Sequence, residues 1–389
     1  MKVTVSAGGR FHAFHLAEQL QRRGVLHRFI TSRFYYRPTQ DAIDREKVVP
    51  LTLPDVVNQM LKYTPGLRYA LPWSYTKDAL FDRLACPHID RCDIFVGFAS
   101  FALRSMPAAK ALGAVTVLER GSAHIEVQRA LLQEEYHRWG VRTAATHEGA
   151  VQAQQQEYLE TDYICVPSDF VRKSFIDQKV DAHKLIQVPY GVDLKTFCVR
   201  AKPDRTFRVV FAGEVSLQKG IPYLLEAVSM LKIKNMELVL IGAIARESLP
   251  FIKKYAGRVV HHGKVSRAAM PCRYSDASVF VLPSIQDGFG MVILEAMASG
   301  IPVIVSEHTA GRDIVREGID GFVVPIRDPQ AIAAKLLALY EDEPRRHEMG
   351  LAARRRAEEF SWDRYGDRTT EAYQRLLHPQ GAGATSLPQ

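Results

Sequence analysis

The feature that most constrains the fold of this chain is a repeated alternation between short β-branched runs and longer amphipathic stretches. VTVSA, DIFVGFA and AVTVLE alternate with HAFHLAEQLQRRG and with a helical pattern over residues 105–112. The alternation restarts midway, where RVVFAG, ELVLIG, VFVLPS and PVIVS are separated by PYLLEAVSMLK, MVILEAMAS and AIAAKLLALYED. Apolar strands that alternate with helices form parallel sheets covered on both faces. The pattern therefore predicts an α/β protein with two doubly wound sheets.

Length and turn residues divide the chain near residue 200. A chain of 389 residues exceeds one ordinary hydrophobic core. Pro189, Gly191 and Pro203 interrupt the stretch between the two sets of strands. We expect an N-terminal domain (1–199), a C-terminal domain (200–361), a last helix (about 362–378) packed back on the first domain, and a frayed tail (379–389). Two such sheets bind ligands at the carboxyl ends of their strands, which predicts an active site between the domains.

Composition excludes several classes of protein. Lys and Arg number 51 against 43 Asp and Glu, a net charge of +8, and no nucleic-acid recognition motif accompanies this basic balance. The five cysteines are scattered, which argues for a reducing compartment. The segment CPHIDRC lacks a second ligand pair, so we interpret it as a loop rather than a metal site.

The N-terminus lacks a signal-peptide pattern, and no apolar run approaches the roughly 18 to 20 residues that cross a bilayer. We expect a cytoplasmic protein.

A glycine turn in the second half is the strongest candidate for a binding site. In DGFGMVILE, residues 287–295, a helix is predicted to open after Gly290. Such a helix start presents free amide groups, and glycine lets an anion approach the backbone, so the turn is predicted to bind a phosphate. Asp287 belongs either to this site or to a plain N-cap. Glu295 interrupts an apolar helix, and because buried carboxylates need partners we interpret it as a ligand-binding residue.

Two further residues are candidates on position alone. Lys219 lies between a strand that ends at Gly213 and the helix PYLLEAV, where anions bind parallel sheets; the alternative is a solvated turn lysine. His124, in ERGSAHIEVQ, is either a hydrogen-bonded structural residue or a substrate contact.

Taken together, these motifs resemble the retaining family 4 glycosyltransferases of GT-B fold. The resemblance covers nearly the whole chain and includes GG at 8–9, VPS at 166–168, VPYGVD at 188–193, FAGEVSLQKGIPYLLEA at 211–227 and DGFGMVILE with AMASGIPVI. The family's signature is Glu, seven residues, Glu, and here Asp287 and Glu295 take the two positions. The resemblance implies two Rossmann-like domains that face each other across a cleft, the first on the acceptor side and the second binding the nucleotide-sugar donor.

The same resemblance implies a role for each candidate residue. Glu295 would bind the ribose hydroxyls, Asp287 would lie near the donor-sugar hydroxyls and Lys219 would meet the diphosphate. His124 falls where the family often places a histidine beside the donor sugar. The implied catalytic residues are His124, Lys219 and Asp287, and the implied donor-binding residues are Gly9, Gly213, Lys219, Val265, Gly288, Phe289, Gly290 and Glu295.

Two positions depart from the family's pattern. Asp287 is one methylene shorter than the usual Glu. Glu214 stands where many members carry an arginine that helps the lysine neutralise the diphosphate, and an acid there would repel a phosphate at close range. Another cation must supply that charge, and the sequence leaves Arg10, Arg120 and Arg312 open.

Motifs for other chemistries are absent from the sequence. It contains no G-x-G-x-x-G after the first strand, no P-loop, no G-x-S-x-G and no H-E-x-x-H. No Asp-x-Asp motif indicates a divalent metal on the diphosphate, so a lysine and a helix dipole would have to hold it. We therefore expect no metal and no cofactor besides the nucleotide diphosphate sugar as co-substrate.

The segment from Arg22 to Arg37 is basic and aromatic. Residues 1–40 contain seven Lys and Arg against one acid, Glu18, interleaved with Phe29, Phe34 and two tyrosines. Such a patch docks on anionic lipid or holds an acidic, lipid-linked acceptor; alternatively these arginines form a solvated helix face and loop.

The function predicted from the sequence is retaining transfer of a sugar to a hydroxyl of a glycan or lipid-linked acceptor, in cell-surface polysaccharide or glycoconjugate biosynthesis. Retention rests on the family resemblance. Two alternatives stay open: a nucleotide-sugar 2-epimerase of the same architecture, and an inactive GT-B scaffold, the latter because of Glu214 and Asp287.

Overall fold

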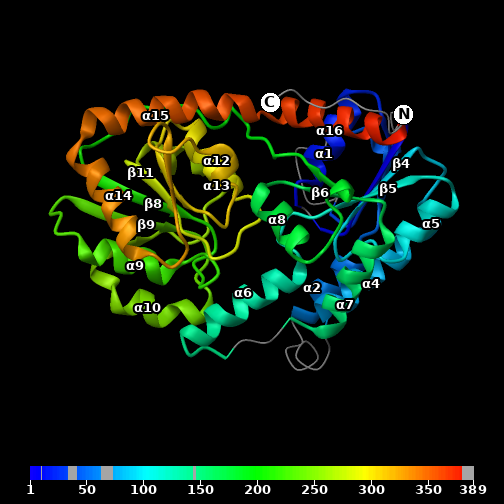
Figure 1. The fold of residues 1–389 in the computed structure, drawn as a ribbon, viewed down its shortest axis with the longest axis horizontal. Coiled ribbons are helices and arrows are strands. Elements are labelled where there is room, and N and C mark those ends of the chain that lie inside the picture. Colours follow the sequence, from blue (N-terminus) through cyan, green and yellow to red (C-terminus); the bar gives the residue numbers. More distant parts are fainter. Residues whose placement is uncertain (10, 34–41, 63–72, 143–145, 379–389) are drawn as a thin grey trace.

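Two parallel sheets form the centre of the molecule, each covered by helices (Figure 1). The structure, a computed structural model, describes residues 1–9, 11–33, 42–62, 73–142 and 146–378. The strand order is β3-β2-β1-β4-β5-β6-β7 in the first sheet and β10-β9-β8-β11-β12-β13 in the second, with parallel pairing between neighbours. This confirms the predicted fold class of two doubly wound α/β sheets.

The strands of the first sheet lie within the first half of the chain. They are β1 (Val3–Ala7), β2 (Leu26–Thr31), β3 (Val48–Pro50), β4 (Ile94–Phe98), β5 (Val115–Glu119), β6 (Tyr163–Val166) and β7 (Leu185–Gln187). β1 and β4 are buried along their whole length, as expected for central strands covered on both faces. The helices of this half are α1 (Ala13–Arg22), α2 (Leu53–Lys62), α4 (Trp73–Ala85), α5 (Ser105–Ala111), α6 (Ile125–Arg138), α7 (Glu148–Glu160) and α8 (Asp169–Asp177).

The second sheet repeats this organisation with a smaller set of strands. They are β8 (Phe207–Ala212), β9 (Met236–Ile241), β10 (Val259–His261), β11 (Val279–Leu282), β12 (Val303–Ser306) and β13 (Gly321–Val324). The remaining helices are α9 (Ile221–Met230), α10 (Leu249–Lys254), α11 (Met270–Ser275), α12 (Met291–Ala298), α13 (Gly311–Ile314), α14 (Pro329–Glu341), α15 (Glu343–Ala357) and α16 (Trp362–Leu377).

The chain crosses between the two sheets twice, and the two crossings touch. The amide of Val192 donates to the carbonyl of Phe360 at 2.8 Å. At Gly191 an added Cβ would lie 2.5 Å from the backbone nitrogen of Trp362, so only glycine permits this approach. After this point α16 returns to the first sheet and packs against α1 (Figure 1). The C-terminal helix is therefore part of the first structural unit, although it follows the second in sequence.

Helix α6 makes the other large contact between the two halves. Its last turn reaches helices α9 and α10 (Figure 1), and Glu135, fully buried there, accepts hydrogen bonds from Tyr223 Oη at 2.8 Å and Arg327 Nε at 2.7 Å. Trp139, which follows α6, donates to the same carboxylate at 2.8 Å and packs its ring against Phe251. A buried carboxylate with three donors thus ties the first half of the chain to the second.

Replacing Glu135 with alanine is expected to destabilise the protein by about 3 kcal/mol, because removing one partner of a buried ion pair leaves the others unpaired. The unfolding free energy is measured by urea denaturation. The matched control is Glu134→Ala: Glu134 bonds to the same Arg327 at 2.6 Å, but its side chain is 55% exposed, so a loss below about 1 kcal/mol is expected. Equal effects of the two substitutions would contradict a structural role for the buried carboxylate.

Candidate active site

A cavity of about 590 Å³ lies between the two sheets, at the carboxyl ends of their central strands. Its walls come from the segments that follow β1, β4 and β5 on one side and β8 and β11 on the other. In each sheet the strand order reverses at this place, between β1 and β4 and between β8 and β11. Doubly wound sheets bind their ligands at such switch points. The cavity therefore lies where the two-sheet pattern predicts an active site.

Lys219 and Asp287 form an ion pair on the second-sheet side of the cavity, and both line it. Lys219 precedes α9 and Asp287 follows β11, so the two come from adjacent strand ends. The backbone amide of Asp287 donates to the carbonyl of His308 at 3.0 Å, which orients the residue. Helix α12 begins instead after Gly290, at φ 74°, with no side-chain cap. Asp287 is therefore not the N-cap of α12, and its carboxylate forms an ion pair with Lys219.

The glycine turn itself lies between Asp287 and α12. Phe289 and Gly290 line the cavity together with Gly213. Within the described part of the chain, the amides of Gly288, Phe289 and Gly290 have no hydrogen-bond acceptor. Gly288 faces the other half of the molecule, and its carbonyl accepts from Ser168 Oγ at 2.6 Å. The turn thus presents free donors beside an ammonium group, an arrangement that attracts anions.

Four of the predicted donor-binding residues do not line this cavity: Gly9, Val265, Gly288 and Glu295. Glu295 is half-buried on α12, where it accepts from Tyr274 Oη at 3.2 Å. Burial raises the pKa of Glu295, and the positive charge of Arg267 opposes that rise. Val265 lies outside the lining as well, and so does Gly9, although Phe11 and His12, which follow the same glycine turn, do contribute to it.

The structure places His124 in a structural position outside the cavity. Its side chain caps α6, with Nδ1 accepting from the amide of Glu126 at 3.3 Å, and its ring packs against Tyr158 and Phe175. Burial, and then the charge of Arg120, lower the pKa of His124 to about 4. The imidazole therefore stays neutral at physiological pH, and its role in the described structure is to cap helix α6. The family resemblance implies a place for His124 beside the donor sugar, and that role stays a prediction.

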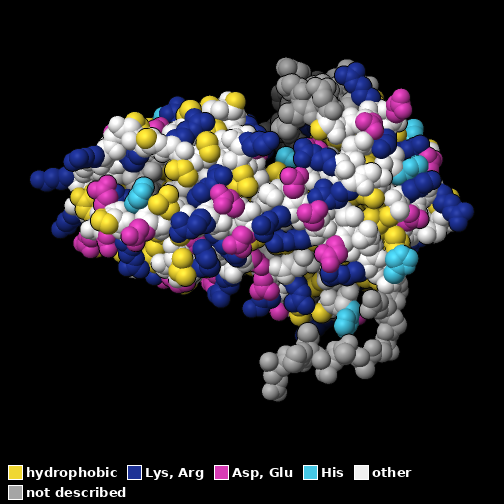
Figure 2. Space-filling view, turned by 90° about the horizontal axis from the view of Figure 1, so that it is seen from above, with side chains coloured by type: hydrophobic (Ala, Val, Ile, Leu, Met, Phe, Trp, Pro, Cys, Tyr) yellow, Lys and Arg dark blue, Asp and Glu magenta, His cyan; other side chains and the backbone are white. Residues whose placement is uncertain are grey.

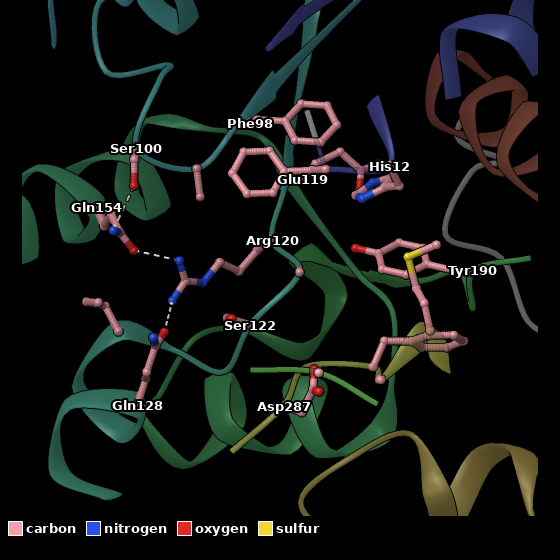
Figure 3. A pocket seen from close by; sticks show the side chains of 18 of the residues that line it. His12, Phe98, Ser100, Glu119, Arg120, Ser122, Gln128, Gln154, Tyr190 and Asp287 are labelled. Atoms are coloured by element: carbon pink, nitrogen blue, oxygen red, sulfur yellow. Dashed lines mark hydrogen bonds and ion pairs between the residues drawn. The ribbon is translucent and has the colours of Figure 1, made fainter. Parts of the chain in front are cut away.

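A different histidine lines the cavity. His12 Nε2 and Glu119 Oε2 are 3.0 Å apart, both side chains are almost fully buried, and both belong to the lining (Figure 3). The His12 ring lies tilted against the Tyr190 ring, with 4.1 Å between centroids, and Tyr373 of α16 donates to Glu119 at 3.5 Å. Sequence reasoning missed this pair. Only the positions of the two residues in the sequence could have indicated the pair. His12 follows the first glycine turn, and Glu119 ends a predicted strand.

Of the three arginines that the sequence left open as a further cation, one is exposed, one lines the cavity on the side of the first sheet, and one lies outside the described residues. Arg312 is exposed and pairs with Glu307 at 2.6 Å outside the cavity, whereas Arg120 lines it. Arg10 lies outside the described residues. Glu214, which raised the question, is exposed and does not line the cavity, so its charge does not face a ligand bound there.

Most of the basic segment at Arg22 to Arg37 is already paired. Arg22 bonds to Asp363 at 3.1 Å, Arg23 to Asp367 at 2.6 Å, and Arg33 to Asp55 at 2.8 Å. Arg28 also pairs with Asp90. Figure 2, which views the face that carries α15 and α16, shows basic and acidic side chains interspersed. Phe29 is buried, and residues 34–37 lie outside the described part. These four arginines therefore form ion pairs within the protein and do not make up an unpaired basic surface.

The described residues contain neither a candidate metal cluster nor a helix that could span a membrane. No three or more His, Cys, Asp or Glu side chains in that part of the chain are grouped so that they could hold a metal ion. No helix there has the length and apolar character needed to cross a membrane.

Known proteins match the chain in sequence. Residues 206–342 match the family model described as glycosyl transferases group 1. A D-inositol 3-phosphate glycosyltransferase of Xylanimonas cellulosilytica is 30% identical over 57% of this chain and 61% of its own length. A phosphatidyl-myo-inositol mannosyltransferase of Mycolicibacterium smegmatis is 27% identical over 51% of this chain and 53% of its own. The chain spans little more than half the length of these curated relatives.

Solved structures match the chain over nearly its whole length. Sucrose-phosphate synthase from Thermosynechococcus elongatus superposes with a TM-score of 0.68 at 18% identity, covering 98% of this chain and all (100%) of the other. HepE of Anabaena, in complex with UDP, gives a TM-score of 0.71 at 16% identity, covering 97% and 100%. These likenesses confirm the predicted GT-B arrangement of two Rossmann-like sheets.

Proposed function

Because residues 206–342 carry a glycosyl transferases group 1 domain and the whole chain has the GT-B fold, we propose that this protein is a glycosyltransferase. It transfers a sugar from a nucleotide diphosphate sugar to a hydroxyl of a glycan or lipid-linked acceptor, in polysaccharide or glycoconjugate biosynthesis. The observation that carries the proposal is the cavity between the sheets, where Lys219 and a turn with free amides face the pair His12 and Glu119. One wall suits an anion, and the other offers polar groups to a sugar or acceptor.

The donor's diphosphate is proposed to bind at Lys219 and the turn 288–290. The transition state of glycosyl transfer is oxocarbenium-like, and negative charge builds on the departing diphosphate. An ammonium group and preorganised amides stabilise that charge as it develops. The relative HepE, whose structures hold UDP and UDP-glucose, has the same fold. The resemblance to retaining enzymes supports retention at the anomeric carbon, with the leaving phosphate taking the acceptor's proton, so that neither a protein base nor a metal ion is required.

Closure of the two halves over the donor is part of the proposal. Gly288 of the second half already touches Gly121 of the first, since an added Cβ at Gly288 would lie 1.7 Å from the carbonyl oxygen of Gly121. A closed cleft excludes water, which protects the activated sugar from hydrolysis. The proposal does not extend to an anionic membrane surface, because Arg22, Arg23 and Arg33 have carboxylate partners.

Binding and product analysis test the function. The protein is titrated with UDP, GDP and ADP, and their sugar derivatives are screened by thermal shift, since a ligand that binds the native state raises the melting temperature. A bound nucleotide diphosphate is expected, and an inactive scaffold need not bind one. Incubation with the donor alone then separates transfer from epimerisation, because an epimerase converts its substrate without an acceptor. No binding of any nucleotide would overturn the proposal.

Glu295→Ala is expected to weaken binding of the nucleotide diphosphate 10- to 100-fold, if the carboxylate accepts hydrogen bonds from the ribose, since hydrogen bonds to a charged group contribute about 1.5 to 3 kcal/mol. The measurement is calorimetric titration. The control is the 2′-deoxy form of the same nucleotide, which should bind the wild-type protein more weakly but bind the variant much as the ribose form does. If the variant still discriminates between the two forms as the wild type does, Glu295 makes no ribose contact.

A further inference from the structure

Arg120 is a buried cation in the cavity wall whose hydrogen-bond partners are all neutral. Its guanidinium donates to Gln154 Oε1 at 2.7 Å, to Gln128 Oε1 at 2.9 Å and to the carbonyl of Ala123 at 2.7 and 3.1 Å (Figure 3). The residue is 7% exposed, and it lines the cavity. Because charged groups that leave water are normally paired, a buried guanidinium held by neutral oxygens points to a missing anion.

The acidic residues that line the cavity do not supply that anion. Asp78 pairs with Lys77 at 2.8 Å, Glu119 lies 3.0 Å from His12, and Asp287 pairs with Lys219. Among the ion pairs of the described residues, none includes Arg120. Its positive charge therefore remains available to a ligand that enters the cavity.

Neutral donors stand beside this cation. The carbonyl oxygen of Gln128 accepts from Arg120, which leaves the Gln128 amide group as a donor that bonds to no residue the structure describes. The hydroxyl of Ser122 has no partner there either, and both residues line the cavity. All three side chains come from the segment between β5 and the first turn of α6, whose helix start adds a partial positive charge. This set of donors suits a small oxyanion.

The donors belong to the first half of the molecule, not to the proposed diphosphate site. In Figure 3 the guanidinium lies between Gln154 and Gln128, with Asp287 apart from it. Gln154 is held in turn by Ser100 Oγ at 2.8 Å, so the guanidinium is fixed on that side. Lys219 and the amides of residues 288–290 come from the other half. A donor held by Lys219 thus leaves Arg120 facing the space for the acceptor.

We propose that Arg120, with Gln128 and Ser122, forms a subsite for an anionic group on the acceptor, a phosphate or a carboxylate. The inference rests on the proposed function, and it specifies the class of acceptor: an alcohol that carries a negative charge. Arg120 binds and orients this group, so that a neighbouring hydroxyl faces the donor sugar. A neutral acceptor would leave the guanidinium without a counter-ion.

The test separates the two halves of the site. The protein is saturated with the nucleotide diphosphate that it binds, which fills the diphosphate site, and is then titrated with sodium phosphate or sodium acetate against sodium chloride at equal ionic strength. A saturable rise of the melting temperature with phosphate or acetate is expected, and the more effective anion identifies the acceptor's group. We expect Arg120→Gln to weaken this anion binding at least about tenfold and to bind the nucleotide as the wild type does. If neither anion has an effect beyond chloride, the proposal is wrong.

Controls guard against misfolding and against general charge effects. Arg129→Gln removes a neighbouring arginine that already pairs with Glu126 and Glu148, and it should leave anion binding unchanged. Arg120→Lys keeps the charge and should retain most of the binding. Gln128→Ala, at a half-buried position, should weaken it and serves if Arg120→Gln does not fold. Loss of nucleotide binding in Arg120→Gln would instead assign Arg120 to the donor, whereas a wild-type protein that binds no nucleotide would overturn the proposed function separately.

Discussion

Lys219→Ala is expected to lower kcat by about two orders of magnitude, which corresponds to about 3 kcal/mol of transition-state stabilisation. The lysine side chain lines the cavity and is held by Asp287, so its charge is oriented before the donor arrives. A preorganised cation needs no rearrangement as charge builds on the leaving diphosphate. Initial rates of nucleotide release, with a competent donor and acceptor, give kcat and KM for the variant and the wild type.

The control for this substitution is Lys232→Ala. Lys232 is exposed after α9 and precedes β9, so it lies at the amino end of a strand, away from the cavity. Its loss should leave kcat unchanged. The double variant with Asp287→Asn then measures the coupling between lysine and aspartate. A near-normal rate for Lys219→Ala would show that another group holds the diphosphate.

Gly288→Ala is expected to reduce turnover at least about 100-fold while the protein still binds the nucleotide, because displacing reacting groups by about 1 Å is enough for such a loss. The added methyl would lie 1.7 Å from the carbonyl oxygen of Gly121 and 2.9 Å from the Cα of Ser122. Both are backbone atoms, which cannot rotate away as the end of a side chain can. The variant must therefore separate the two halves of the cleft where they touch.

Gly257→Ala is the matched control for the glycine substitution. It has no heavy atom within 4 Å of the added Cβ and lies on the surface, so activity and stability should not change. Rates are compared with nucleotide affinity in both variants. If Gly288→Ala turned over substrate normally, the contact between Gly288 and Gly121 would not belong to the active conformation.

Local patterns were sufficient to predict the fold class. Runs such as RVVFAG and VFVLPS became β8 and β11, adjacent strands of one parallel sheet. The reason is that a strand buried on both faces must be apolar throughout, and the helices between must be amphipathic, so each segment carries its own signal. The separate last helix, α16, was also predictable, because the helical pattern is interrupted between Phe360 and Trp362.

The candidate site was predictable in part. Lys219, Asp287, Phe289 and Gly290 were singled out because they follow strands or open a helix, and they line the cavity. His12 and Glu119 carried no comparable signal, because their pairing joins positions 107 residues apart. His124 lies close in sequence to Arg120, and sequence alone could not tell which of the two side chains turns toward the cavity.

The sequence by itself determined two parallel sheets, the connector between them and a glycine turn with a lysine nearby, because strand burial, helix amphipathicity and turn chemistry are properties of neighbouring residues. The tertiary structure alone decided which charges are already neutralised. Asp287 is paired with Lys219, His12 lies against Glu119, and Arg120 is left with neutral partners. Those pairings depend on distances between side chains from separate strands, and such distances exist only once the two halves have packed together.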